Sequence, residues 1–207
     1  MSRRLRAVLL ALVSACGASA QTVYWNFNTE TPTSNAVTNV TAGPLSRWDG
    51  GDTAMLSGSS VSTTNEYISA SGGSNAMAYA AGLALNTNTS AYFQFTLTPA
   101  EGYILNLTNV SFGVRSTLTG PQAFSIRNSL DNFVGDLATG SIGNDSTWVL
   151  KSVAPLFRSS VAGEPVTFRI YGYNGTSKAL NWRIDDLSLE VAAAVPKTPN
   201  GFMMLVK

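Results

Sequence analysis

Apolar and polar residues alternate in short runs along most of this chain, and residues that favour turns separate the runs. The clearest runs are residues 92–97, 107–115 and 166–171. In the first of them Phe93, Phe95 and Leu97 share one face. Strict alternation over a few residues predicts a half-buried β-strand, and no long stretch of the chain has helical periodicity.

About nine strands are predicted in this way, which is enough for two packed sheets. The connections between them are short and contain no convincing crossover helix, so antiparallel pairing is expected. Residues 29–66 are rich in Thr, Ser, Asn and Gly and predict an irregular excursion over the surface. We therefore predict an all-β fold, a two-sheet antiparallel jelly-roll-like sandwich, with an immunoglobulin-like sandwich as the alternative.

The last long run, residues 180–191, changes phase in its middle. Leu180, Trp182 and Ile184 alternate on even positions, whereas the apolar positions after them are odd, beginning at Leu187. The pair Asp185-Asp186 lies at the change. Because a strand repeats every two residues, such a slip predicts a β-bulge. The closing strand is therefore expected to hold two carboxylates at a defined place.

The first 20 residues have the pattern of a secretory signal peptide. A basic start precedes an apolar core, and Ala18-Ser-Ala20 is a small-x-small cleavage signal. Val13-Ser-Ala-Cys16 also resembles a lipobox, so the alternative is a lipoprotein anchored at Cys16. We expect residues 1–20 to be a signal peptide, 21–192 one domain and 193–207 a flexible tail. The protein is then secreted or held at the cell surface or outer envelope, without a transmembrane segment.

Composition excludes several function classes. The chain has no histidine, and its single cysteine lies in the leader, so neither a Ser-His-Asp triad nor a His or Cys metal site is expected. Loss of the leader removes Arg3, Arg4 and Arg6, and 13 − 3 = 10 cations against 12 carboxylates give a net charge of −2. A chain without a basic field has no electrostatic support for binding nucleic acid.

The aromatic residues are the candidates for ligand contact. Trp25 and Trp182 share phase with aliphatic neighbours and are expected in the core. Trp48, in Arg47-Trp-Asp-Gly50, suits either a sugar-stacking platform or a plug over the sandwich. By phase the remaining candidates face away from the core: Tyr92, Arg169, Tyr171 and Tyr173. They either form an exposed binding surface or only reflect the ordinary preference of tyrosine for β-strands.

Five segments in a fixed order resemble a group of exported bacterial β-sandwich proteins of the PEP-CTERM type, common in Verrucomicrobia and Planctomycetes. They are residues 23–28, 91–103, 127–133, 167–172 and 182–187. The group is mostly uncharacterised, and its domain is similar to jelly-roll carbohydrate-binding modules. The tail departs from the sorting signal of the group. Val195-Pro begins at the right place, but no spanning helix and no arginine cluster follow.

The resemblance to jelly-roll carbohydrate-binding modules implies a structural Ca²⁺ as the one cofactor. An acidic residue of the last strand often ligates that ion, helped by oxygens near the first strand. The corresponding ligands here are Asp185, Asp186, Asn26, Asn28 and Glu30. The alternative is an exposed carboxylate, or one paired with Arg183, at the bulge.

These observations predict a non-catalytic exported protein that binds polysaccharide or another extracellular surface polymer. The alternative is a structural protein of the cell envelope or matrix with no small ligand. A polysaccharide-degrading glycoside hydrolase or lyase is the third hypothesis, because such an enzyme needs only two carboxylates. No catalytic residue is assigned.

Overall fold

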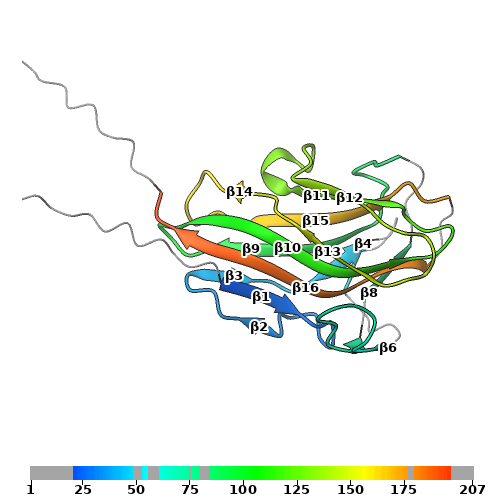
Figure 1. The fold of residues 1–207 in the computed structure, drawn as a ribbon. Coiled ribbons are helices and arrows are strands. Elements are labelled where there is room, and N and C mark those ends of the chain that lie inside the picture. Colours follow the sequence, from blue (N-terminus) through cyan, green and yellow to red (C-terminus); the bar gives the residue numbers. More distant parts are fainter. Residues whose placement is uncertain are drawn as a thin grey trace, which may run out of the picture.

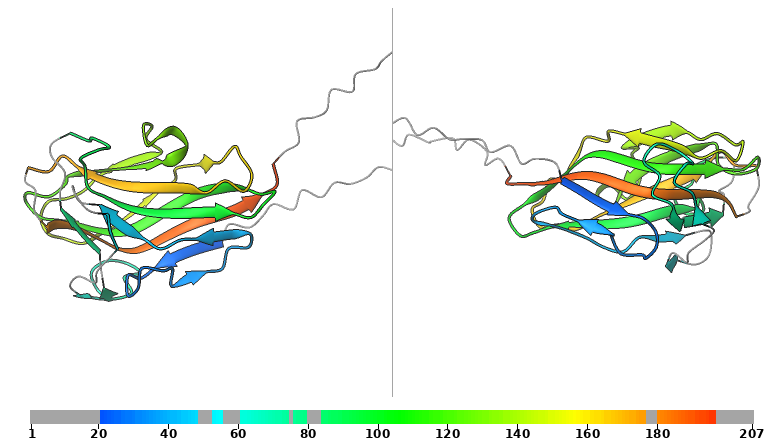
Figure 2. Two further views of the ribbon diagram at one scale, coloured as in Figure 1. Left: turned by 180° about the vertical axis from the view of Figure 1, so that it is seen from behind. Right: turned by 60° about the horizontal axis from the view of Figure 1, so that its bottom comes forward.

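The computed structural model describes residues 21–48, 53–55, 61–74, 76–79, 84–176 and 180–196. Its strands form two large antiparallel sheets stacked face to face, as Figures 1 and 2 show from three directions. Nine of the described strands are four or more residues long. The all-β, two-sheet antiparallel sandwich predicted from the sequence is thereby confirmed. The predictions for the leader and for residues 197–207 lie outside the described residues.

Sheet A contains the first and last strands of the domain. Its order is β13-β10-β16-β1-β2, while β14 adds to β10 and β8 adds to β16. The bounds of these strands are β1 (Gln21–Trp25), β2 (Ser34–Asn35), β8 (Ala76–Tyr79), β10 (Ile104–Ser116), β13 (Val149–Val153), β14 (Phe157–Arg158) and β16 (Leu180–Ala194).

Sheet B covers the other side of the core. Its order is β12-β11-β15-β9-β4-β5, and β3 also pairs with β9. The bounds are β3 (Val40–Ala42), β4 (Ser46–Trp48), β5 (Thr53–Met55), β9 (Tyr92–Pro99), β11 (Ala123–Asn128), β12 (Ala138–Ser141) and β15 (Val166–Tyr173). A 3₁₀ turn, η1 (Ser129–Asp131), follows β11, and a small hairpin pairs β6 (Val61–Ser62) with β7 (Gly73–Ser74).

Aromatic pairs that reach from one sheet to the other fill the core. Trp182 of β16 meets Phe93 of β9 with ring centroids 4.8 Å apart, and Trp25 of β1 meets Phe95 at 5.7 Å. Both tryptophans are fully buried, as their phase predicts. Gly172 of β15 makes room for Trp182, since a Cβ there would lie 2.9 Å from the indole. Truncating either tryptophan is expected to cost about 3–5 kcal/mol.

The polar region 29–66 is more ordered than its composition suggests. β3 and β4 pair with β9 and extend sheet B, and Leu45 between them is fully buried. The prediction of an irregular surface excursion is therefore wrong for residues 40–48. Their strand signal is weak because only three residues pair in each segment, too few for an alternating pattern to show.

Candidate functional site

The phase slip in β16 is a β-bulge. On the neighbouring strand β10, Ser111 pairs with Ser188 and Gly113 pairs with Asp185. Phe112 alone therefore stands opposite both Asp186 and Leu187. Asp186 takes a left-handed backbone conformation, with φ of 49°. The predicted bulge is confirmed, and it turns the Asp186 side chain to the outer face of sheet A.

Asp186 is only 5% exposed, and its carboxylate accepts several hydrogen bonds. Tyr24 of β1 and Tyr67 donate their phenol hydroxyls to its two oxygens. Ser71 donates its backbone N–H at 3.0 Å and its hydroxyl at 2.5 Å. These four residues are called the Asp186 network below. The alternative of an exposed carboxylate at the bulge is wrong, because Asp185 is also fully buried.

The Asp186 network fixes the loop of residues 63–72 on sheet A. This loop joins β6 to β7, and Tyr67 and Ser71 both belong to it. The Tyr67 ring lies directly on Gly113 of β10, where a Cβ would stand 2.5 Å from the ring carbon Cζ. Burial, and then the bond to Asp186, raise the pKa of Tyr67, and the same causes raise the pKa of Tyr24 to about 12. Both phenols are therefore neutral donors at ordinary pH.

The other predicted calcium ligands form hydrogen bonds to other residues of the protein. The Asn26 side-chain oxygen accepts the Thr33 hydroxyl at 2.8 Å and the Asn28 N–H at 3.1 Å. The Asn28 oxygen accepts the Ser74 N–H of β7 at 3.2 Å, and the Glu30 backbone carbonyl accepts the Leu45 N–H.

Within the described ranges, no three carboxylate, histidine or cysteine side chains gather where they could hold a metal ion. A cation at the Asp186 oxygens would have to displace phenol donors. Calcium binding at Asp185, Asp186, Asn26, Asn28 and Glu30 stays a prediction.

On sheet B, three predicted contact residues form one row across neighbouring strands. Trp48 of β4 pairs with Tyr92 of β9, which pairs with Tyr171 of β15. The Trp48 and Tyr92 rings are stacked at 5.6 Å with 18° between their planes, and the Tyr171 ring meets Tyr92 edge-on at 5.2 Å. Trp48, Tyr92 and Tyr171 are called the aromatic row below.

Arg169 crosses the aromatic row. Its guanidinium carbon lies 4.1 Å from the centroid of the Tyr92 ring and 3.8 Å from that of Phe133. The same side chain donates to Gln94 at 2.9 Å and to the Tyr171 hydroxyl at 3.2 Å. Cation–π contact of this kind is worth about 0.5–2 kcal/mol, the larger value where water is excluded. Arg169 therefore fixes the positions of both tyrosines.

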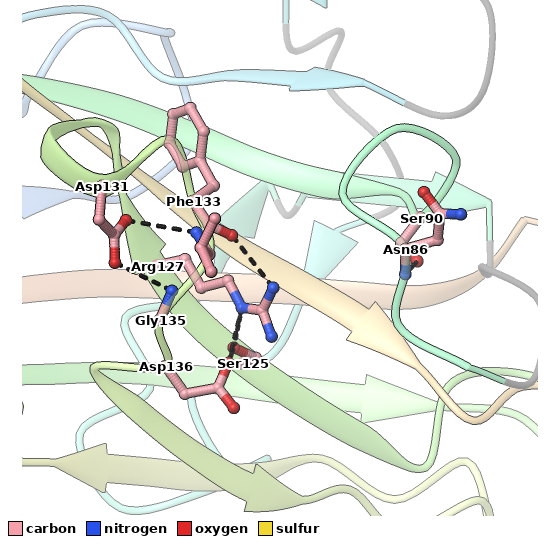
Figure 3. A network of polar contacts seen from close by, with 9 residues as sticks. Asn86, Ser90, Ser125, Arg127, Asp131, Phe133, Gly135 and Asp136 are labelled. Atoms are coloured by element: carbon pink, nitrogen blue, oxygen red, sulfur yellow. Dashed lines mark hydrogen bonds and ion pairs between the residues drawn. The ribbon is translucent and has the colours of Figure 1, made fainter.

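A network of polar contacts around η1 holds the Phe133 ring against Arg169. Figure 3 shows Arg127, Asp131, Phe133 and Asp136 of this network. Arg127 of β11 bonds the Asp136 carboxylate at 2.6 Å and the Phe133 carbonyl at 3.0 Å. Asp131 accepts the backbone N–H of Gly135 at 2.9 Å, as expected of an aspartate in a turn. Phe133 itself is half-buried and lies outside the core cluster between the sheets.

The sequence predicts the direction of these tyrosines correctly and their exposure wrongly. Tyr92 and Tyr171 alternate with core residues, and neither belongs to the core cluster between the sheets. Yet Tyr92 is 7% exposed and Tyr171 is 0% exposed, because rings and a guanidinium pack on the outer face of sheet B. Trp48 keeps part of its surface open, and Tyr173, at the end of β15, is half-buried.

No family model and no curated protein matches this chain. Among solved structures, this chain is similar to a carbohydrate-binding module of Cellvibrio mixtus lichenase 5A in complex with cellotriose. The two chains are 12% identical with a TM-score of 0.36, and the match covers 70% of this chain and 95% of that one. The family 11 carbohydrate-binding module of Clostridium thermocellum is 15% identical with a TM-score of 0.34, covering 85% and 98%.

The K1 cleaved adhesin domain of Lys-gingipain from Porphyromonas gingivalis is 14% identical with a TM-score of 0.36, covering 82% and 98%. In the part of the chain that the structure describes, no helix has the length and hydrophobicity to cross a membrane.

Proposed function

We propose that this protein is an exported, non-catalytic β-sandwich that binds polysaccharide, or another extracellular surface polymer, on the outer face of sheet B. One observation carries the proposal. Four of the five residues predicted as ligand contacts, from three strands far apart in sequence, meet there: Trp48, Tyr92, Arg169 and Tyr171.

The chemistry of the aromatic row suits a sugar chain. The C–H groups of a pyranose ring pack on the face of an aromatic ring, and hydroxyl groups at the ring edge need polar partners. Trp48 is the member with open surface, so it is the contact residue. Tyr92 and Tyr171 lie behind it as a rigid support, and Arg169 fixes that support in position.

The test is binding of the full chain to insoluble cellulose and xylan, and to laminarin and mixed-linkage glucan in affinity gels. Trp48→Ala is expected to weaken binding at least about tenfold, since aromatic anchors dominate such contacts. Tyr103→Ala, which removes a half-buried ring outside the row, is the matched control and should bind normally. Binding to none of these glycans, or equal binding by a folded Trp48→Ala variant, would overturn the proposal.

A structural envelope or matrix protein with no small ligand is the second candidate. The near-complete burial of Tyr92 and Tyr171 favours it, because buried rings stabilise a fold and do not meet a ligand directly. The two candidates predict different phenotypes for Trp48→Ala: lost glycan binding with normal stability in the first, and lost stability without any glycan binding in the second.

A further inference from the structure

A pocket lies on the side of the sandwich opposite the aromatic row, on the outer face of sheet A. Its volume is about 290 Å³, at the small end of the range for ligand pockets. Strands β1, β10, β13 and β16 supply its floor, and the 63–72 loop supplies one wall. The residues that line it are Tyr24, Tyr67, Ser69, Ser111, Leu150, Asp186 and Ser188.

Asp186 gives this pocket a defined hydrogen-bonding character. Because Tyr24 and Tyr67 donate their protons to the Asp186 carboxylate, both phenol oxygens keep lone pairs that can accept, and the Tyr24 oxygen also meets the Ser71 side chain. A phenol that donates to a carboxylate is also a better acceptor, since neighbouring hydrogen bonds polarise one another. The pocket therefore favours a ligand with hydroxyl groups that donate.

The remaining lining matches a small polyhydroxylated ring. Ser111 and Ser188 form a register pair on adjacent strands, and both are half-buried. Their hydroxyls can donate or accept, while Leu150 and the tyrosine rings offer an apolar side. None of the described residues that line the pocket is an arginine or lysine, so these residues do not favour an anion.

We propose that this pocket binds a single neutral sugar unit, with hydroxyl groups that donate to the phenol oxygens of Tyr24 and Tyr67. The site is independent of the aromatic row, because the two lie on the outer faces of different sheets. It fits one ring and not an extended chain, because its volume is that of a small pocket.

The experiment is a titration of the full chain with glucose, galactose, mannose, xylose and arabinose, read by saturation-transfer NMR and calorimetry. Ser111→Leu fills the pocket and should weaken binding by about tenfold or more. Ser152→Leu is the matched control: Ser152 is the β13 partner of Ser111, is exposed and does not line the pocket. Ser152→Leu and Trp48→Ala should both bind like the wild type.

Tyr67→Phe provides a second variant in case Ser111→Leu does not fold. It removes one phenol oxygen and keeps the ring, so weakened binding with a cooperative melting transition supports the proposal. The proposal is overturned if no sugar of the panel binds, if folded Ser111→Leu binds as well as Ser152→Leu, or if a simple primary amine binds and the sugars do not. Loss of this binding in Trp48→Ala would also overturn it, by placing the sugar on sheet B.

Discussion

Asp186 and Arg169 occupy comparable positions on the outer faces of the two sheets, and each organises two aromatic residues. Asp186 does so on sheet A by accepting hydrogen bonds from Tyr24 and Tyr67. Arg169 does so on sheet B by lying against the rings of Tyr92 and Phe133. The first arrangement depends on hydrogen bonds to a single carboxylate, whereas the second depends on contacts between aromatic rings and a guanidinium group.

The two faces also differ in what their central charge fixes. The Asp186 network attaches a loop that pairs with neither large sheet, so its loss frees a whole segment. The Arg169 contacts join Tyr92 and Tyr171, which their own strands already hold in place, and Phe133, which the network around η1 holds. We therefore expect changes on sheet A to cost more stability than equivalent changes on sheet B.

Among changes on the outer faces, Asp186→Ala is expected to have the largest effect, a loss of about 3 kcal/mol in the free energy of unfolding, because it leaves the half-buried phenols of Tyr24 and Tyr67 without their acceptor. Asp186→Asn should cost about half as much, since asparagine tolerates the left-handed backbone and keeps one side-chain oxygen. Urea unfolding of both variants measures the difference. Losses below about 1 kcal/mol in both would show that the network contributes little.

Gly113→Ala is expected to cost about 2 kcal/mol, because the new methyl group would overlap the Tyr67 ring. The loss should become small in a Tyr67→Ala background, where the ring is absent. A double-mutant cycle from denaturant unfolding tests this coupling. Equal losses in both backgrounds would mean that strain in β10, and not the loop, is responsible.

Arg169→Met is expected to cost about 1.5 kcal/mol, as it keeps an apolar stem but loses the contacts with two rings and two hydrogen-bond partners. Arg158→Met, on the exposed side of β14, is the matched control and should be close to neutral. Thermal unfolding of the two variants checks the comparison. A loss above that of Asp186→Ala would reverse the ranking of the two faces.

Alkaline pH should produce the smallest effect. The pKa of Tyr24 in the folded protein is raised from 10.0 to about 12, so the unfolded chain releases this proton first. The free energy of unfolding therefore falls as pH rises from 10 to 12, and Tyr24→Phe should make that fall shallower.

Tyr92→Phe should change the pH dependence of the free energy of unfolding less than Tyr24→Phe does. The reason is that Arg169 opposes the increase that burial causes in the pKa of Tyr92. Denaturant midpoints across this pH range test both variants. An equal slope in wild type and Tyr24→Phe would contradict the role of that phenol.

The sequence predicts what depends on local alternation. Trp25 and Trp182 share phase with aliphatic neighbours and lie in the core. The slip at Asp185-Asp186 is visible because both halves of β16 have regular patterns of their own. The sandwich follows from these runs, since each strand must bury one face.

The covering of the outer faces depends on distant partners, which no local pattern shows. Tyr67 and Asp186 are 119 positions apart in the chain, and Tyr67 lies in a segment with no alternation. Tyr24 carried a signal, because it alternates with Val23 and Trp25 and so faces outward, but no local pattern indicates that it meets Asp186. The burial of Tyr92 and Tyr171 could not be predicted either. It depends on packing with distant residues such as Trp48, whose short strand β4 has too weak a signal in the sequence.

The pairing of β1 with β16 determines how the domain responds to a pulling force. Gln21 pairs with Val191 in an antiparallel ladder. The start of β1 and the end of β16 therefore lie at the same end of sheet A (Figure 1). Tension applied between residues 21 and 194 acts across this ladder and not along it. The hydrogen bonds of β1 then break one pair after another, as in a zipper, instead of resisting together. The bulge at Asp186 lies just beyond the last of these pairs, Trp25 with Leu187, so the bond from the Tyr24 phenol to Asp186 adds resistance near the end of this sequence of breaks.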